Sequence, residues 1–156
     1  AEPLNGDCTF EPHVIELEDG RLLGMIRSDR KEYQPFTMFQ TYSDDGGKTW
    51  STPTPTGIDG APPHLFRTSS NVLVLSYGRR RLPYGERVSL SFDNGQTWEE
   101  HILLDNAESS DLGYGSTTEL PDGTLFTVYY HRTAKDSIAS VMYTKWKIIR
   151  SSSNDQ

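Results

Sequence analysis

Two octapeptides of nearly the same sequence decide the fold class of this chain: SDDGGKTW at residues 43–50 and SFDNGQTW at residues 91–98. Both follow the pattern S-x-D-x-G-x-T-W and start 48 positions apart, at 43 and 91. The Asp can accept hydrogen bonds from its own turn, the Gly supplies a positive φ, and the Trp fills apolar space between strands. Each of these octapeptides, called a box below, is therefore expected to be a turn between two strands. The residues expected to hold these turns are Ser43, Asp45, Gly47, Trp50, Ser91, Asp93, Gly95 and Trp98.

A second motif repeats in register with the boxes. It is VIELEDGRLLGMIR at residues 14–27 and TTELPDGTLFTVYY at residues 117–130, with a degenerate copy, HLFRTSSNVLVLSY, at residues 64–77. The turn positions Gly20, Asn71 and Gly123 are 51 and 52 residues apart. The Asp-Gly pairs predict two-residue hairpin turns, and their flanks have the Val, Ile, Leu, Thr, Tyr and Phe content of strands.

Units of about 50 residues with four short strands each are typical of β-propeller blades. We expect an all-β fold of three four-stranded blades, at roughly residues 5–57, 58–106 and 107–149, and a disordered polar tail at residues 151–156. Closed propellers use about 4–8 blades. Three blades therefore predict half of a six-bladed propeller, completed by a missing N-terminal half or by a homodimer. Trp50, Trp98 and Trp146 recur at 48-residue steps, which favours core plugs over sugar platforms.

Composition excludes several classes of protein. The chain has 156 residues, with 22 acidic against 15 basic side chains and a net charge of −7, so we expect no nucleic-acid partner. Its apolar runs are shorter than the ~18 residues of a membrane helix. The single cysteine, Cys8, excludes an internal disulfide framework and a cysteine-based zinc cluster. We expect no metal or cofactor. The compartment stays open, with a secreted or periplasmic location favoured over a cytoplasmic one.

The repeat register places polar residues on one rim. The start of the first strand and the end of the second share an edge of each unit, opposite the boxes. Counting nine residues back and seven forward from each turn position gives Glu11, Pro62 and Tyr114, and Arg27, Gly78 and Tyr130. Arg79, Arg80 and Arg81 follow Gly78, and His131 follows Tyr130. We expect these side chains to face one central funnel.

This set of residues has a definite chemistry. Arginines offer fixed forks for a carboxylate, and a phenol beside a carboxylate can act as a nucleophile. Glycosidases with a tyrosine nucleophile are the exception to the usual carboxylate pair. An uncharged tyrosine suits a substrate whose reacting carbon bears a carboxylate, because a carboxylate nucleophile would be repelled.

The box is similar to the Asp box, or bacterial neuraminidase repeat, and the chain resembles the C-terminal half of a sialidase-like Asp-box propeller over roughly residues 5–149. The segments EPHVIELEDGRL at residues 11–22 and GYGSTTELPDGT at residues 113–124 carry this resemblance, together with YGRR at residues 77–80 and PYGER at residues 83–87. In the sialidase pattern, a serine follows the tyrosine where this chain has Gly115.

The resemblance implies a sialidase-like glycoside hydrolase that acts on terminal acidic sugars, with Tyr114 as nucleophile and Glu11 activating it. It implies that Arg27 holds a substrate carboxylate together with a second arginine, Arg80 or Arg87. Tyr130 and His131 are further candidates for substrate contact. Sialidases also take a first arginine and an acid/base Asp from N-terminal blades. No segment of this chain matches either, so whether it acts as an enzyme by itself stays open.

Two other functions stay open at this point. One is a non-catalytic propeller module that binds carbohydrate or protein, and the other is a related hydrolase or lyase for uronate-containing glycans. An acidic carbohydrate is the expected partner of the sialidase-like reading. His13 and His64 occupy equivalent repeat positions 51 residues apart, which favours structural strand residues over zinc ligands.

Overall fold

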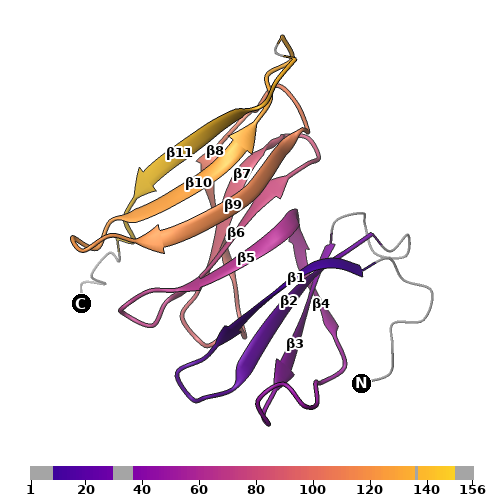
Figure 1. Cartoon of the computed structure of the whole chain (residues 1–156), viewed down its shortest axis with the longest axis vertical. Coiled ribbons are helices and arrows are strands. Elements are labelled where there is room, and N and C mark those ends of the chain that lie inside the picture. The colour runs from indigo at the N-terminus through magenta and orange to yellow at the C-terminus, as the bar shows by residue number, and fades with distance from the viewer. Residues whose placement is uncertain (1–8, 30–36, 136, 150–156) are drawn as a thin grey trace, which may run out of the picture.

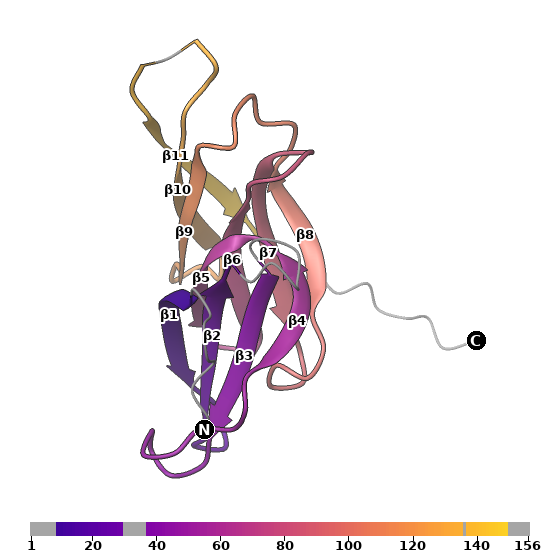
Figure 2. The same cartoon turned by 90° about the vertical axis from the view of Figure 1, so that its right-hand side faces the viewer.

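The computed structural model describes residues 9–29, 37–135 and 137–149, and it is all-β in that part of the chain. In the described residues eleven strands form three antiparallel sheets, which Figures 1 and 2 show side by side with the second between the other two. The first sheet contains β1 (Thr9–Glu16), β2 (Leu22–Ser28), β3 (Thr37–Ser43) and β4 (Thr54–Asp59). The second contains β5 (Ala61–Arg67), β6 (Leu73–Arg79), β7 (Gly85–Ser91) and β8 (Glu99–Leu104). The third contains β9 (Leu112–Glu119), β10 (Leu125–His131) and β11 (Ser140–Trp146).

The expected all-β fold is confirmed, and the arrangement is consistent with part of a β-propeller. The expectation of three four-stranded blades needs one correction, because the third sheet has three strands in the described part of the chain. There β11 is an edge strand, and residues 147–149 add no ladder to it. Cys8 and the polar tail at residues 151–156 lie outside the described residues.

The β1–β2, β5–β6 and β9–β10 hairpins share one loop geometry, which differs from the two-residue turns that the Asp-Gly pairs predict. In the first, the Gly20 N–H donates to the Leu17 carbonyl and the Leu17 N–H donates to the Arg21 carbonyl. Only Gly20 has a positive φ, of 83°. This is a three-residue loop with a left-handed last residue. The Asp19 carboxylate instead accepts the Arg21 N–H at 3.1 Å.

The degenerate second hairpin folds in the same way. Asn71 takes the left-handed position with φ 61°, which asparagine tolerates better than most residues. The Thr68 hydroxyl accepts the Val72 N–H at 3.0 Å, as the carboxylate does in the first hairpin. The loss of Asp-Gly from the sequence therefore leaves the turn intact.

The two boxes have nearly identical internal hydrogen bonds. In the first, Ser43 Oγ accepts the Gly47 N–H at 2.9 Å, and Asp45 accepts the Thr49 N–H at 2.8 Å and the Thr49 hydroxyl at 2.6 Å. In the second, the Gly95 N–H lies 2.8 Å from Ser91 Oγ, and Asp93 again holds the threonine of its box. Each box is thus closed by its own side chains, as predicted.

The sheets pack face to face through two apolar clusters. Leu23, Met25 and Met38 of the first sheet meet Leu73, Leu75 and Tyr77 of the second. Between the second and third sheets lies a cluster of Val72, Val74, Val88, Leu90 and Leu125. The buried hydroxyl groups of Ser76, Thr117 and Thr127 continue that second interface as a chain of hydrogen bonds. Because side chains on β6 alternate between faces, the middle sheet is buried on both sides.

Trp98 and Trp146 fill spaces between sheets, but not from one repeat position. Trp50, also expected to be a core plug, instead lines a hollow on the outward face of the first sheet. Trp98 packs against the first cluster and donates to Gln40 of the neighbouring sheet at 3.2 Å. Trp146 packs against the second cluster. It pairs with Leu125, whereas Ser43 and Ser91 hold the matching places opposite Leu22 and Leu73. Trp146 is therefore not at the position of its sheet that Trp50 and Trp98 occupy in theirs, although 48 residues separate it from Trp98.

The outward faces of the first and third sheets are apolar and uncovered. On the first sheet a hollow of about 250 Å³ is lined by Pro12, Val14, Gly24, Ile26, Thr41, Trp50, Ser51 and Pro53. On the third sheet, Phe126 stacks on Tyr143 with ring centroids 5.1 Å apart, and Val141 is 80% exposed. The middle sheet shows what these faces lack, because both of its faces are covered by neighbouring sheets. Among the described residues no helix is long and apolar enough to cross a membrane.

Candidate active site

The candidate site is built on β-bulges that occur at equivalent positions of β1, β5 and β9. The pairing register shifts between Phe10 and His13 in β1 and between Ala61 and His64 in β5. In β9 it shifts between Gly113 and Ser116. A bulge re-aims the side chains of its strand. Glu11 and Tyr114 lie in these bulges, with left-handed φ values of 50° and 54°.

The two bulges bring Tyr114 and Glu11 together across 103 residues of sequence. The Tyr114 hydroxyl donates to Glu11 Oε1 in a short hydrogen bond. The other oxygen, Oε2, accepts a hydrogen bond from Arg27 Nη1 at 2.8 Å. The Arg27 guanidinium also contacts both Asp29 carboxylate oxygens, at 3.4 and 3.3 Å. A phenol, a carboxylate and a guanidinium thus form one chain of hydrogen bonds. Tyr114, at one end of this chain, is 54% exposed.

The hydrogen bonds set the protonation states of this pair. Partial burial alone would raise the pKa of Glu11, but the hydrogen bonds from Tyr114 and Arg27 outweigh it and lower that pKa below its ordinary value. The hydrogen bond to the Glu11 carboxylate raises the pKa of Tyr114, although Arg80 and Arg27 act in the opposite direction. At neutral pH the phenol therefore keeps its proton beside an ionised carboxylate, which is the starting state for proton transfer to a general base.

Arg80 is the second guanidinium at this site. Its carbon Cζ lies 5.6 Å from the centroid of the Tyr114 ring. Its Nε donates to the Leu112 carbonyl at 3.0 Å, and its Nη2 lies 3.4 Å from the Tyr130 hydroxyl. Tyr130 in turn donates to Asp111 at 2.8 Å, and its ring centroid lies 5.9 Å from that of Tyr114. Arg80 and Tyr130 are thus neighbours of the proposed nucleophile.

The other two arginines of the run point elsewhere. Arg81 donates to Asp59 of β4 at 2.7 and 3.0 Å. Arg79 lies 4.0 Å from Asp59 and 3.9 Å from Glu100. Both therefore pair with the outer strands, and Arg80 alone of the three joins Tyr114.

Arg87 and His131, expected as substrate contacts, do not join this group. The Arg87 side chain is 1% exposed, and its Nη1 donates to the Leu104 carbonyl at 2.6 Å while its Nη2 pairs with Asp105 at 3.1 Å. His131 is buried at 9% exposure, in line with Leu125, Thr127 and Tyr129 on the buried face of β10. Strand alternation is the physical reason, because neighbours of a rim residue point to the opposite face.

The sequence predicted no role for three residues of this region, Asp111, Glu86 and Gly115. Asp111 holds the Tyr130 hydroxyl and also pairs with Arg132 at 2.9 Å. Glu86 is a fully buried carboxyl group, and Gly115 is the residue it contacts. A signal for Glu86 existed, since it lies 48 positions after the buried Met38, at a core position of the repeat.

The paired histidines are structural, as the repeat predicted. His13 of β1 accepts the Leu65 N–H of β5 with Nδ1 at 3.2 Å, and His64 of β5 accepts the Thr117 N–H of β9 at 3.4 Å. Their rings lie 4.6 Å apart. Each imidazole thus ties one inner strand to the next. Among the described residues no group of three or more His, Cys, Asp or Glu side chains is placed to hold a metal ion.

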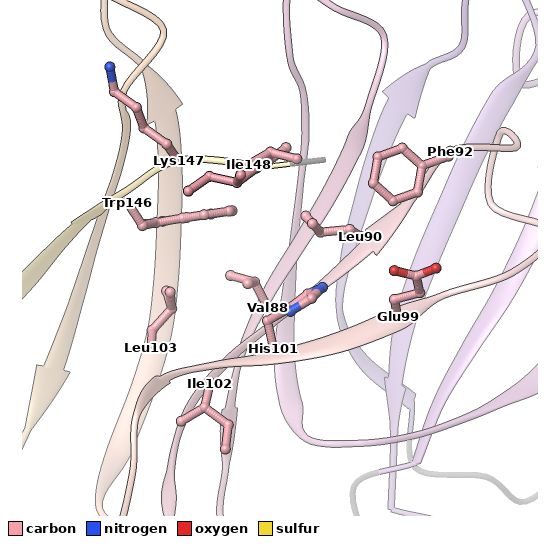
Figure 3. A pocket seen from close by; sticks show the side chains of 11 residues that line it. Val88, Leu90, Phe92, Glu99, His101, Ile102, Leu103, Trp146, Lys147 and Ile148 are labelled. Carbon is pink, nitrogen blue, oxygen red and sulfur yellow. The ribbon is translucent and has the colours of Figure 1, made fainter. Parts of the chain in front are cut away.

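A larger hollow lies away from the tyrosine site, between the second and third sheets. It measures about 770 Å³, and in Figure 3 the side chains of Val88, Leu90 and Trp146 converge on it. Phe92, Glu99 and Ile148 complete its sides. It lies near the C-terminal end of β11, the edge strand of the incomplete sheet. Because Tyr114, Glu11 and Arg80 are absent from its lining, we do not assign the substrate to it.

Comparison with known families fits this repeat structure. The model of the BNR repeat-like domain matches residues 2–129. The chain belongs to the BNR repeat-like domain family. Among curated proteins none matches it. Family membership accounts for the repeated boxes and sheets, and it leaves the reaction open.

Solved structures with a similar fold extend the comparison of this BNR repeat-like chain. A protein of unknown function from Dyadobacter fermentans DSM 18053 has a TM-score of 0.83 and 25% identity, over 92% of this chain and 39% of that one. An endo-arabinase from Bacteroides thetaiotaomicron VPI-5482 has a TM-score of 0.64 and 13% identity, over 92% and 58%. A xylan beta-1,4-xylosidase from Bacillus halodurans C-125 has a TM-score of 0.59 and 17% identity, over 87% and 30%. The BNR repeat-like chain thus spans less than two thirds of each of these proteins.

Proposed function

We propose that this chain carries the nucleophile side of a sialidase-type glycoside hydrolase site. The observation that supports it best is the hydrogen bond from the Tyr114 hydroxyl to Glu11, whose other oxygen Arg27 holds. Two proteins with a similar fold are an endo-arabinase and a xylosidase, which supports a carbohydrate-active setting. The sialidase type itself rests on the tyrosine–glutamate pair and the arginines around it.

In the proposed reaction the Tyr114 oxygen attacks the anomeric carbon while its proton passes to Glu11. The glycosidic C–O bond breaks, and the leaving oxygen takes a proton from an acid that the rest of the site supplies. Asp29 and Asp111 are carboxylates of this rim, but each is already paired with an arginine, Arg27 and Arg132 respectively. Arg27 and Arg80 provide the positive charge that attracts a sugar carboxylate.

We further propose that additional sheets complete a six-bladed ring and bring that acid to the site. The uncovered apolar faces of the first and third sheets support this, since each resembles a face that is covered in the middle sheet. The sheets come either from the same polypeptide or from a second copy of this chain. In this proposal the chain contributes three of the six blades, at roughly residues 5–57, 58–106 and 107–149.

Turnover of an aryl sialoside by the complete protein tests the proposed function. Tyr114→Phe is expected to abolish measurable turnover, and Glu11→Gln to lower kcat about 10²–10⁴-fold because the general base is lost. The matched control is Tyr143→Phe, which removes the hydroxyl of an exposed tyrosine on β11.

Three outcomes contradict the proposal in different ways. Full activity of Tyr114→Phe excludes Tyr114 as the nucleophile. Sugar binding without turnover, unchanged in Tyr114→Phe, indicates a binding module. Turnover of uronate glycans but not of sialosides indicates that the rim serves a different acidic sugar.

A further inference from the structure

Glu86 is a buried carboxyl group that the proposed reaction does not use. It lies on β7 between Gly78 of β6 and Leu104 of β8, and its side chain is 0% exposed. Neither carboxyl oxygen has a hydrogen-bond partner among the described residues. A buried polar group without a partner is costly and uncommon, so a core position held by Glu86 calls for a physical reason.

The Glu86 carboxyl group lies directly against the strand that carries Tyr114. A Cβ atom built on Gly115 would lie 2.1 Å from Glu86 Oε1 and 3.1 Å from Ser76 Cβ. Any side chain at residue 115 therefore collides with Glu86. Glycine at this position and glutamate at position 86 are a matched pair, one leaving the space that the other fills.

Glu86 and Arg80 support the Tyr114 bulge from its two ends. Arg80 Nε holds the Leu112 carbonyl, two residues before Tyr114, and its guanidinium lies over the phenol ring. Glu86 packs against Gly115, the residue after Tyr114. Between them Tyr114 keeps a left-handed φ of 54°, a conformation that a bulky residue adopts only where its surroundings hold it.

The protonation state of Glu86 fits a packing role. Burial raises the pKa of Glu86 to about 8, although the nearby Arg80 and Arg87 guanidiniums act in the opposite direction. The carboxyl group is then neutral at pH 7. A neutral Glu86 does not draw Arg80 into an ion pair, so Arg80 stays beside Tyr114 and Tyr130.

We propose that Glu86 is a positioning residue that packs against Gly115 and thereby holds the Tyr114 hydroxyl on Glu11. The inference deepens the proposed function and rests on it, because Tyr114 is the nucleophile of that proposal. The position of the Tyr114 hydroxyl relative to Glu11 can nevertheless be measured without any turnover.

The test is the titration of the Tyr114 phenol, followed by NMR of the full chain with ¹³Cζ-labelled tyrosine and assigned with Tyr114→Phe. Glu86→Ala is expected to lower the pKa of Tyr114 toward its ordinary value, because a displaced phenol loses its hydrogen bond to Glu11. Glu86→Gln keeps the shape without a charge and is expected to match the wild type at pH 7. The amide spectrum of each variant checks that it is folded.

A second variant covers the case in which Glu86→Ala does not fold. Gly115→Ala keeps Glu86 but places a methyl group against its carboxyl group. It is expected to displace Tyr114 and to lower the pKa of its phenol in the same direction.

An unchanged Tyr114 titration in folded Glu86→Ala overturns the inference, as does an unchanged Tyr114 titration in Gly115→Ala. Absence of sialoside turnover in the wild type, with these shifts present, overturns only the proposed function.

Discussion

Asp45 illustrates how a single residue stabilises a turn through its charge. The side-chain and backbone hydrogen bonds from Thr49 lower the pKa of Asp45 to about 2, against an ordinary value of 3.8. The carboxylate form is therefore favoured in the folded chain. Linkage requires that the stability it adds is fully present above pH 3.8 and is lost as the pH falls toward 2. In the second box, partial burial would raise the pKa of Asp93, but the hydrogen bonds from Thr97 outweigh it and lower that pKa as well.

Replacing Asp45 tests this charge. Asp45→Asn is expected to lower the free energy of unfolding at pH 6 and to flatten its decline between pH 4 and pH 2, because the titrating carboxylate is gone. Urea denaturation at a series of pH values measures both effects. Asp44→Asn, which removes the neighbouring charge of the same box, is the matched control. Equal slopes for wild type and Asp45→Asn contradict the assignment.

At the scale of elements, the inner strands are joined by imidazoles. Burial lowers the pKa of His13, and burial together with the charge of His13 lowers the pKa of His64. Both rings use a bare Nδ1 as acceptor for the next strand. The neutral form is thus the folded form, so this contribution is complete above pH 6.5 and is lost as the pH falls through the lowered values.

The element-scale prediction concerns the pH dependence of stability. The free energy of unfolding is expected to fall between pH 7 and pH 5, as protonation breaks the Leu65 and Thr117 contacts and brings two charges together. The double variant His13→Asn/His64→Asn keeps an acceptor near Nδ1 without titrating, so its curve is expected to be flatter. His101→Asn, at an exposed site on β8, serves as the control. A double variant as pH-dependent as the wild type contradicts this role.

At the scale of the whole molecule, the end sheets differ from the middle one in what covers them. The apolar hollow around Trp50 and the Phe126–Tyr143 face are open to solvent. Uncovered apolar patches on a folded protein favour association. The first and third sheets, which carry these faces, lie at opposite ends of the row of sheets in Figure 1, so one face can meet the other of a second copy.

The whole-molecule prediction is self-association of the isolated chain through these faces. Sedimentation velocity is expected to show species larger than the monomer that increase with concentration. Val14→Lys and Val141→Lys, at side chains 47% and 80% exposed, are expected to reduce association without lowering the denaturation midpoint. Ile138→Lys, 77% exposed in the β10–β11 loop, is the control. A wild type that stays monomeric at all concentrations contradicts this expectation.

The sequence by itself determined the features that local interactions or the repeat specify. The boxes close on their own side chains, the hairpins form at Gly20, Asn71 and Gly123, and a common register puts Glu11 and Tyr114 at equivalent bulges. Even the loss of Asp-Gly at the second hairpin left its position predictable, because asparagine can adopt the same φ. These features need only a few neighbouring residues or a regular spacing.

Only the tertiary structure decided which side chains reach the tyrosine. Arg80 turns toward Tyr114 while Arg79 and Arg81 turn toward Asp59, although all three are adjacent in sequence. Arg87 is buried under β8, and Glu86 fills the space that Gly115 leaves. The physical reason is that these orientations depend on contacts between different sheets, whose partners lie tens of residues apart and leave no local pattern.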